Sequence, residues 1–185
     1  SLDLAQLSGV ERTLHGRMMI HIDQPGGKAG DFVLAQATGP ARADSGAPEG
    51  TTAMYRLRIA GHRDKLGDRL DTLMANYETW VDADNNGETD WLTDCWKNSE
   101  VVLPRAQWAC VQWSFDAENN ALRYWLDGQE ITALRVDGVH DFCENADTQQ
   151  GRWTAPERFA ELHLGIEQYH EDAVPRTLYI DDVVV

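Results

Sequence analysis

The chain has 185 residues, 42% of them hydrophobic, which is enough to bury one core of ordinary domain size. Its formal net charge at pH 7 is −15, and a surface of that sign repels the phosphate backbone of nucleic acids. No apolar run approaches the ~20 residues of a membrane-spanning helix. We therefore expect one domain over residues 1–185, with no nucleic-acid partner and no membrane span.

Short alternating segments, separated by Gly, Pro, Asp and Asn, make up most of the chain. Alternation of apolar and polar residues is typical of half-buried strands, and long helical periodicity is absent. The predicted strands lie at residues 13–23, 31–38, 52–60, 72–80, 98–103, 107–115, 121–127, 130–136, 160–169 and 177–185. Residues 140–156 have no clear period and are predicted to form a long loop. This pattern predicts an all-β fold, a β-sandwich of two antiparallel sheets.

Alternation also gives each predicted strand a core face and an outward face. The outward positions carry many Arg, His, Asn, Gln, Glu and aromatic side chains, whose planar groups pair well with hydroxyls and carboxylates. The site candidates among these outward residues are Arg17, His21, Arg56, Arg58, Asn76, Glu78, Trp80, Gln112, His163, Glu167 and Tyr169. We predict one shared concave groove, with Gln112, Glu167 and Arg56 pointing into it. The alternative is a solvated sheet face with cross-strand ion pairs such as Arg56–Glu78.

The segment 82–90 reads DADNNGETD and opens like a calcium-binding loop, with the Asp-x-Asp-x-Asn-Gly pattern that supplies oxygen ligands to a hard cation. The candidate ligands are Asp82, Asp84, Asn86 and Asp90. Thr93 stands where an EF-hand has its twelfth-position Glu. A plain turn rich in Asp and Asn is therefore the alternative to a structural Ca²⁺ site.

The three cysteines are Cys95, Cys110 and Cys143, and no CxxC spacing indicates a zinc site. One disulfide and one free thiol is the favoured interpretation, which is typical of secreted proteins. Cys110 lies on a predicted strand whereas the other two flank loops, so the pairing Cys95–Cys143 is favoured. Three reduced, buried cysteines in a cytosolic protein remain the alternative.

Residues 108–128 (WACVQWSFDAENNALRYWLDG) are predicted to form a strand, a turn and a second strand. This hairpin resembles one that is common in the concanavalin A-like lectin/glucanase superfamily of jelly rolls. The segments LHLGIEQY (162–169) and YIDDVVV (179–185) extend the likeness. Together with Asp94-Cys95-Trp96, they make the chain look most similar to secreted jelly rolls related to alginate and glucuronan lyases.

The resemblance implies a jelly-roll sandwich, a polysaccharide partner and a secreted, extracellular or periplasmic location. Because the sequence starts at Ser1-Leu2 without a signal peptide and stops inside a predicted strand, we expect a mature domain or one excised from a longer protein with further domains. It also implies a structural calcium near Asp181. For a lyase, it implies Arg, Gln or Asn to neutralise the sugar carboxylate and His and Tyr to transfer protons. The candidates are Arg56, Arg58, Gln112 and Asn76 for the first role, and His21, His163 and Tyr169 for the second.

The lyase strings R-x-E-x-R and Q-I-H do not occur, since the first reads Tyr55-Arg56-Leu57-Arg58 here. Paired carboxylates for glycoside hydrolysis and a GxSxG nucleophile motif are also missing. The favoured function is therefore a carbohydrate-binding or polysaccharide-active domain that recognises cell-wall glycan. Its predicted binding residues are Arg17, Arg58, Asn76, Glu78, Glu167 and Trp80. The alternatives are a polysaccharide lyase that cleaves uronate polymers by β-elimination, and a laminin-G-like adhesion domain.

Overall fold

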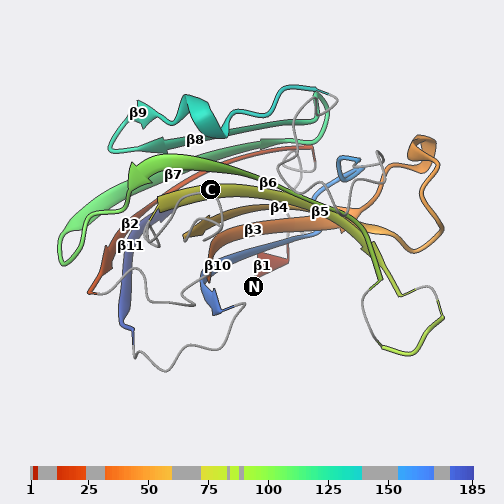
Figure 1. Ribbon diagram of the computed structural model, residues 1–185, viewed down its shortest axis with the longest axis horizontal. Coiled ribbons are helices and arrows are strands. Elements are labelled where there is room, and N and C mark those ends of the chain that lie inside the picture. The colour runs from red at the N-terminus through yellow and green to blue at the C-terminus, as the bar shows by residue number, and fades with distance from the viewer. Residues whose placement is uncertain are drawn as a thin grey trace.

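The protein is an all-β sandwich of two antiparallel sheets (Figure 1), as the alternation predicts. The computed structural model describes residues 2–3, 12–23, 32–59, 72–82, 84–87, 90–138, 154–168 and 176–185. Within these ranges the helices are short 3-10 turns, η2 (Ala43–Ser45) and η3 (Thr132–Leu134). None of the helices in these ranges has the length and apolarity needed to cross a membrane.

Two sheets, one of six strands and one of five, pack face to face. The six-stranded sheet has the order β1 (Leu2–Asp3), β10 (Glu161–Gln168), β3 (Phe32–Pro40), β4 (Thr52–Ile59), β5 (Thr72–Val81) and β6 (Asp90–Val102). The five-stranded sheet has the order β11 (Leu178–Val184), β2 (Thr13–Ile22), β7 (Trp108–Asp116), β8 (Ala121–Leu126) and β9 (Gln129–Glu130). Figure 1 shows β8 and β9 at the top of the view, with β3, β10 and β1 at the bottom.

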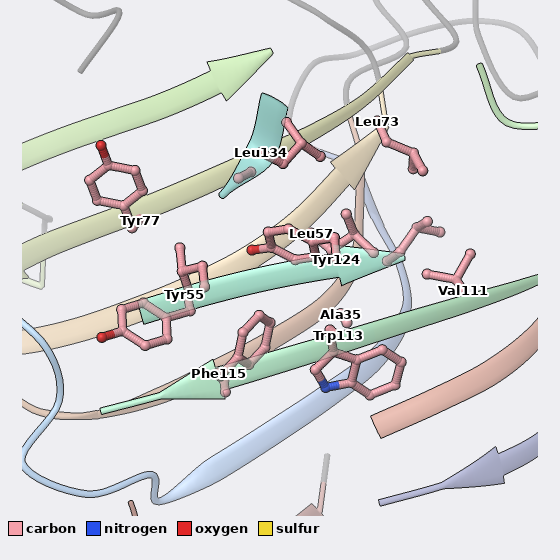
Figure 2. Close-up of a cluster of buried hydrophobic side chains, with 14 of the residues drawn as sticks. Ala35, Tyr55, Leu57, Leu73, Tyr77, Val111, Trp113, Phe115, Tyr124 and Leu134 are labelled. Carbon is pink, nitrogen blue, oxygen red and sulfur yellow. The ribbon is translucent and has the colours of Figure 1, made fainter. Parts of the chain in front are cut away.

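An aromatic cluster fills the core between the sheets (Figure 2). Phe115 of β7 packs edge-on against Tyr55 of β4 and Tyr124 of β8, with ring centroids 5.7 and 6.0 Å apart. The hydroxyls of these two tyrosines are satisfied, since that of Tyr55 donates to Asn120 Oδ1 at 3.1 Å and that of Tyr124 to the Arg56 carbonyl at 2.9 Å. The second bond ties the five-stranded sheet to the strand that carries Arg56.

Two predicted strands differ from those in the structure. The strand predicted at 98–103 is β6, which begins eight residues earlier, at Asp90. Its early core-facing positions include a buried threonine, Thr93, which shares a 2.5 Å hydrogen bond with Thr79, so apolar alternation is absent there. The strand predicted at 130–136 is only the end of β9, followed by η3. Most of the long loop predicted at 140–156 lies outside the described residues, which resume at residue 154.

Gly16 is required by close packing on β2. A Cβ atom placed there would lie 2.2 Å from Cζ2 of Trp113, a core residue that is 1% exposed. We expect Gly16→Ala to lower the free energy of unfolding by about 1–3 kcal/mol, because the indole must move within a packed core. Urea denaturation would measure this, with His15→Ala at the exposed neighbouring position as the control. Equal midpoints for the two variants would contradict the packing argument.

Candidate functional site: a polar groove on the six-stranded sheet

The outer face of the six-stranded sheet carries two lines of polar side chains. Cross-strand partners point to the same face, with Cβ atoms about 4.5–5.5 Å apart. The first line joins His163, Gln36, Arg56, Asn76 and Trp96, one residue from each of β10, β3, β4, β5 and β6. The second line joins Glu161, Thr38, Met54, Glu78 and Asp94 from the same strands. The sequence places these residues outward because their chain neighbours, such as Tyr55 and Leu57, enter the core.

A buried ion pair lies at the centre of this face. Arg56 Nη1 donates to both carboxylate oxygens of Glu78, at 2.9 and 2.8 Å, and Arg56 Nε donates to Gln36 Oε1. Arg56 is 6% exposed and Glu78 is 2% exposed. The cross-strand pair considered in the sequence is therefore present, and it is buried rather than solvated.

Burial sets the protonation of this pair. It raises the pKa of the Glu78 carboxyl to about 7, and the nearby Asp94 carboxylate adds to the rise while Arg56 opposes it. A group that titrates near neutral pH can hold or release a proton under physiological conditions. Proton uptake by Glu78 would leave the Arg56 charge without its neutralising partner.

A second network positions the neighbouring side chains. Arg58 Nη1 donates to Asn76 Oδ1 at 3.0 Å. The Asn76 amide nitrogen donates in turn to Asp94 Oδ1 at 3.2 Å and to the Cys95 carbonyl at 2.9 Å. Asn76 is fully buried with both ends of its amide engaged, so it fixes its neighbours and has little left to offer a ligand.

A groove of about 610 Å³ lies over β10, β3, β4 and the end of β5. Its lining combines a half-buried indole with polar side chains and comprises Gln36, Thr38, Gly39, Pro40, Thr52, Met54, Arg56, Trp80, Ala160, Glu161, His163 and Glu167. His163 Nε2 lies 2.9 Å from Glu161 Oε2. The groove thus offers an aromatic face beside hydrogen-bonding groups, and its carboxylates Glu161 and Glu167 are exposed.

The structure brings most of the predicted site residues together on this sheet. Four of them line the groove, namely Arg56, Trp80, His163 and Glu167. Glu78 lies directly beside the guanidinium of Arg56, and Arg58 and Asn76 occupy the same face. Tyr169 lies outside the described residues. The roles assigned to these residues stay predictions.

The prediction that Gln112 shares a face with Arg56 and Glu167 is wrong. Gln112 lies on β7, and Arg17 and His21 lie on β2, so all three belong to the five-stranded sheet on the opposite side of the sandwich. His21 packs there against the Trp108 ring, with centroids 5.6 Å apart. Alternation separates core from outer face, but it does not say to which sheet a strand belongs.

The other groove residues are not among the predicted site residues, and they include Gln36, Thr38, Met54 and Glu161. Gln36 and Thr38 alternate with the buried Ala35 and Ala37 on β3, and this alternation was the signal that could have found them. Their position in the groove follows from the strand order of the sheet, in which β3 lies between β10 and β4.

The loop that resembles a calcium site forms a turn held by its own backbone. Asp82 accepts hydrogen bonds from the main-chain N–H groups of Asn86 and Gly87, each at 3.0 Å, and Asn86 donates to Asp84 at 3.1 Å. Asp90 is exposed at the start of β6. Asp181 on β11 accepts the Asp182 N–H at 2.8 Å.

Within the described part of the chain, no three His, Cys, Asp or Glu side chains are grouped closely enough to hold a metal. A structural Ca²⁺ stays a prediction. Cys110 carries a free thiol, and Cys143 lies outside the described residues, so the pairing Cys95–Cys143 also stays a prediction.

Comparison with protein-family models and with curated proteins gives no match. Among solved structures, an alginate lyase (AlyC3) aligns over 95% of this chain and 64% of its own, with 10% identity and a TM-score of 0.49. The κ-carrageenase of Pseudoalteromonas carrageenovora, solved with an oligotetrasaccharide, aligns over 95% and 65%, with 11% identity and a TM-score of 0.48. Domains LG4-5 of the mouse laminin alpha1 chain align over 97% and 43%, with 12% identity and a TM-score of 0.39. The chain thus spans less than two thirds of each of these proteins, and the likeness concerns the fold.

Proposed function

We propose that the groove on the six-stranded sheet binds a carbohydrate chain, and that the protein recognises cell-wall glycan outside the cell. One observation carries the proposal: Trp80 shares a groove with the planar hydrogen-bonding groups of Gln36, Arg56 and His163. The apolar face of a pyranose ring packs on an indole, while its hydroxyls pair with planar donors and acceptors.

The charge of the groove favours a neutral glycan. The positive charge of Arg56 is balanced by Glu78, which contacts it through both carboxylate oxygens. Glu161 and Glu167 then add exposed carboxylates to the lining. Like charges placed together across an interface weaken binding, so a polymer of neutral sugars should bind more tightly than a uronate polymer of equal length.

Replacement of Trp80 by alanine tests the stacking role. We expect about a tenfold loss of affinity for the neutral oligosaccharide, because the aromatic contact contributes about 1–2 kcal/mol. A glycan array would select the oligosaccharide, and isothermal titration calorimetry would measure its Kd. Trp108→Ala is the matched control, since Trp108 is a partly exposed tryptophan on the other sheet. Equal losses for both variants, or no glycan bound on the array, would contradict the proposal and favour the adhesion alternative.

A polysaccharide lyase is the second candidate, because a cation and an imidazole, Arg56 and His163, line the same groove. Those are the groups that β-elimination at a uronate needs, one to neutralise the sugar carboxylate and one to exchange a proton. Incubation with glucuronan and alginate, followed by ultraviolet absorbance of the unsaturated product, separates the candidates. No product on either polymer removes the lyase and leaves the binding domain.

A further inference from the structure

A second hollow, of about 480 Å³, lies on the outer face of the five-stranded sheet. Its lining comprises His15, Gly16, Arg17, Gln112, Trp113, Trp125, Gly128 and Val184. No carboxylate belongs to this lining, so its ionisable side chains are all basic. The groove on the six-stranded sheet differs, because Glu161 and Glu167 line it together with Arg56 and His163. The chain as a whole has a formal net charge of −15.

Cross-strand register places three planar groups of this hollow in one line. Arg17 of β2 pairs with Gln112 of β7, and Gln112 pairs with Trp125 of β8. Val184 of β11 lies opposite Arg17 on its other side. Directly opposed residues have Cβ atoms about 4.5–5.5 Å apart, so a guanidinium, an amide and an indole lie side by side.

Arg17 is exposed, and within the described ranges no carboxylate forms an ion pair with it. The arginines at 42, 56, 123 and 135 all have such a partner. Two carboxylates beside the hollow already have partners. Glu130, the cross-strand neighbour of Trp125, pairs with Arg123 and Arg135, and Asp127, next to Gly128, accepts the Cys110 N–H at 2.8 Å. The guanidinium is therefore available to a ligand.

The accessible aromatic surface of the hollow is the indole of Trp125, which is half-buried. Trp113 also borders the hollow, but its indole lies on the core side of β2, where a Cβ of Gly16 would collide with it, and the residue is 1% exposed. An exposed cation, an amide and an indole in one line suit a ring-shaped ligand that carries an acid group.

We propose that this hollow binds a uronic acid residue of a glycan, separately from the groove on the opposite sheet. Arg17 holds the sugar carboxylate with its planar fork, Gln112 pairs with a ring hydroxyl, and Trp125 packs on the pyranose face. A carboxylate is favoured over a sulfate ester because a single guanidinium matches two coplanar oxygens, whereas a sulfate has three oxygens to satisfy.

Calorimetry with the full chain tests this assignment, using oligoglucuronate, a neutral oligosaccharide of the same length and a sulfated oligosaccharide. We expect Arg17→Gln to weaken oligoglucuronate binding about tenfold or more, because a charge-assisted hydrogen bond contributes about 1.5–3 kcal/mol. Arg17→Lys should recover only part of the affinity, because a lysine keeps the charge but lacks the fork. Arg12→Gln removes an equal charge from an exposed position just before β2, outside the lining of the hollow, and should leave binding nearly unchanged.

Three results would overturn the proposal: no binding of oligoglucuronate by the unaltered protein, equal losses for Arg17→Gln and Arg12→Gln, or tighter binding of the sulfated ligand. The proposal would also be overturned if the affinity for oligoglucuronate depended on Trp80 and not on Arg17, because the acidic sugar would then bind in the groove on the six-stranded sheet. Binding of the neutral oligosaccharide tests the groove on the six-stranded sheet alone. Failure of the proposed function can therefore be distinguished from failure of the proposed uronate site.

Discussion

Arg56→Met should lower the free energy of unfolding by about 3–5 kcal/mol at pH 8, because it leaves the Glu78 carboxylate buried without its cation. The pair is almost fully enclosed, and Glu78 accepts both of its short hydrogen bonds from Arg56 Nη1. Gln36 would lose a donor in the same change. Urea denaturation followed by tryptophan fluorescence would measure the loss.

The double variant Arg56→Met/Glu78→Gln is the matched control, because it removes both charges together. It should recover much of the stability, since replacement of a whole buried ion pair is often close to neutral. Arg42→Met removes an exposed arginine that pairs with Asp44 and should have little effect. If Arg56→Met destabilises no more than Arg42→Met, the buried pair does not hold this face together.

The fold could be predicted well from the sequence because strand alternation is a local property. The hairpin at 108–128 is confirmed as β7 and β8, joined by a turn in which Asn120 adopts a positive φ of 57°. Strand β6 is predicted only from residue 98 onward, because core-facing Thr93 interrupts the apolar pattern of its first half and shares a hydrogen bond with Thr79 in the interior.

The candidate site could be predicted only in part, since it depends on which strands become neighbours. Arg56, Glu78 and Trp80 were found because β4 and β5 are adjacent both in the chain and in the sheet. Gln112 was misplaced because β2 pairs with β7, a partner far away in the sequence. A local sequence pattern does not predict such a long-range strand pairing. This pairing places some of the predicted residues in the groove and others in the hollow on the opposite sheet.

Glu78 should also make the stability of the fold depend on pH. Its carboxyl pKa rises from an ordinary 4.5 to about 7 in the folded protein, because burial disfavours the charged form. The folded state therefore holds this proton more tightly than the unfolded state. The resulting stabilisation is fully present below about pH 4.5 and is lost as the pH rises through about 7. At about 1.4 kcal/mol per pH unit, the loss is on the order of 3 kcal/mol.

Urea denaturation of the unaltered protein and of Glu78→Gln between pH 4.5 and 8 would measure this dependence. Every other ionisable group is present in both proteins, so the difference between the two profiles isolates Glu78. The difference should change by a few kcal/mol, the unaltered protein losing stability relative to the variant as the pH rises. A difference that stays flat, or changes in the opposite sense, would mean that Arg56 keeps Glu78 ionised throughout.

A confirmed loss would have a consequence for binding: below pH 7 a protonated Glu78 would free the charge of Arg56, and the groove would then accept acidic sugars that it disfavours at higher pH.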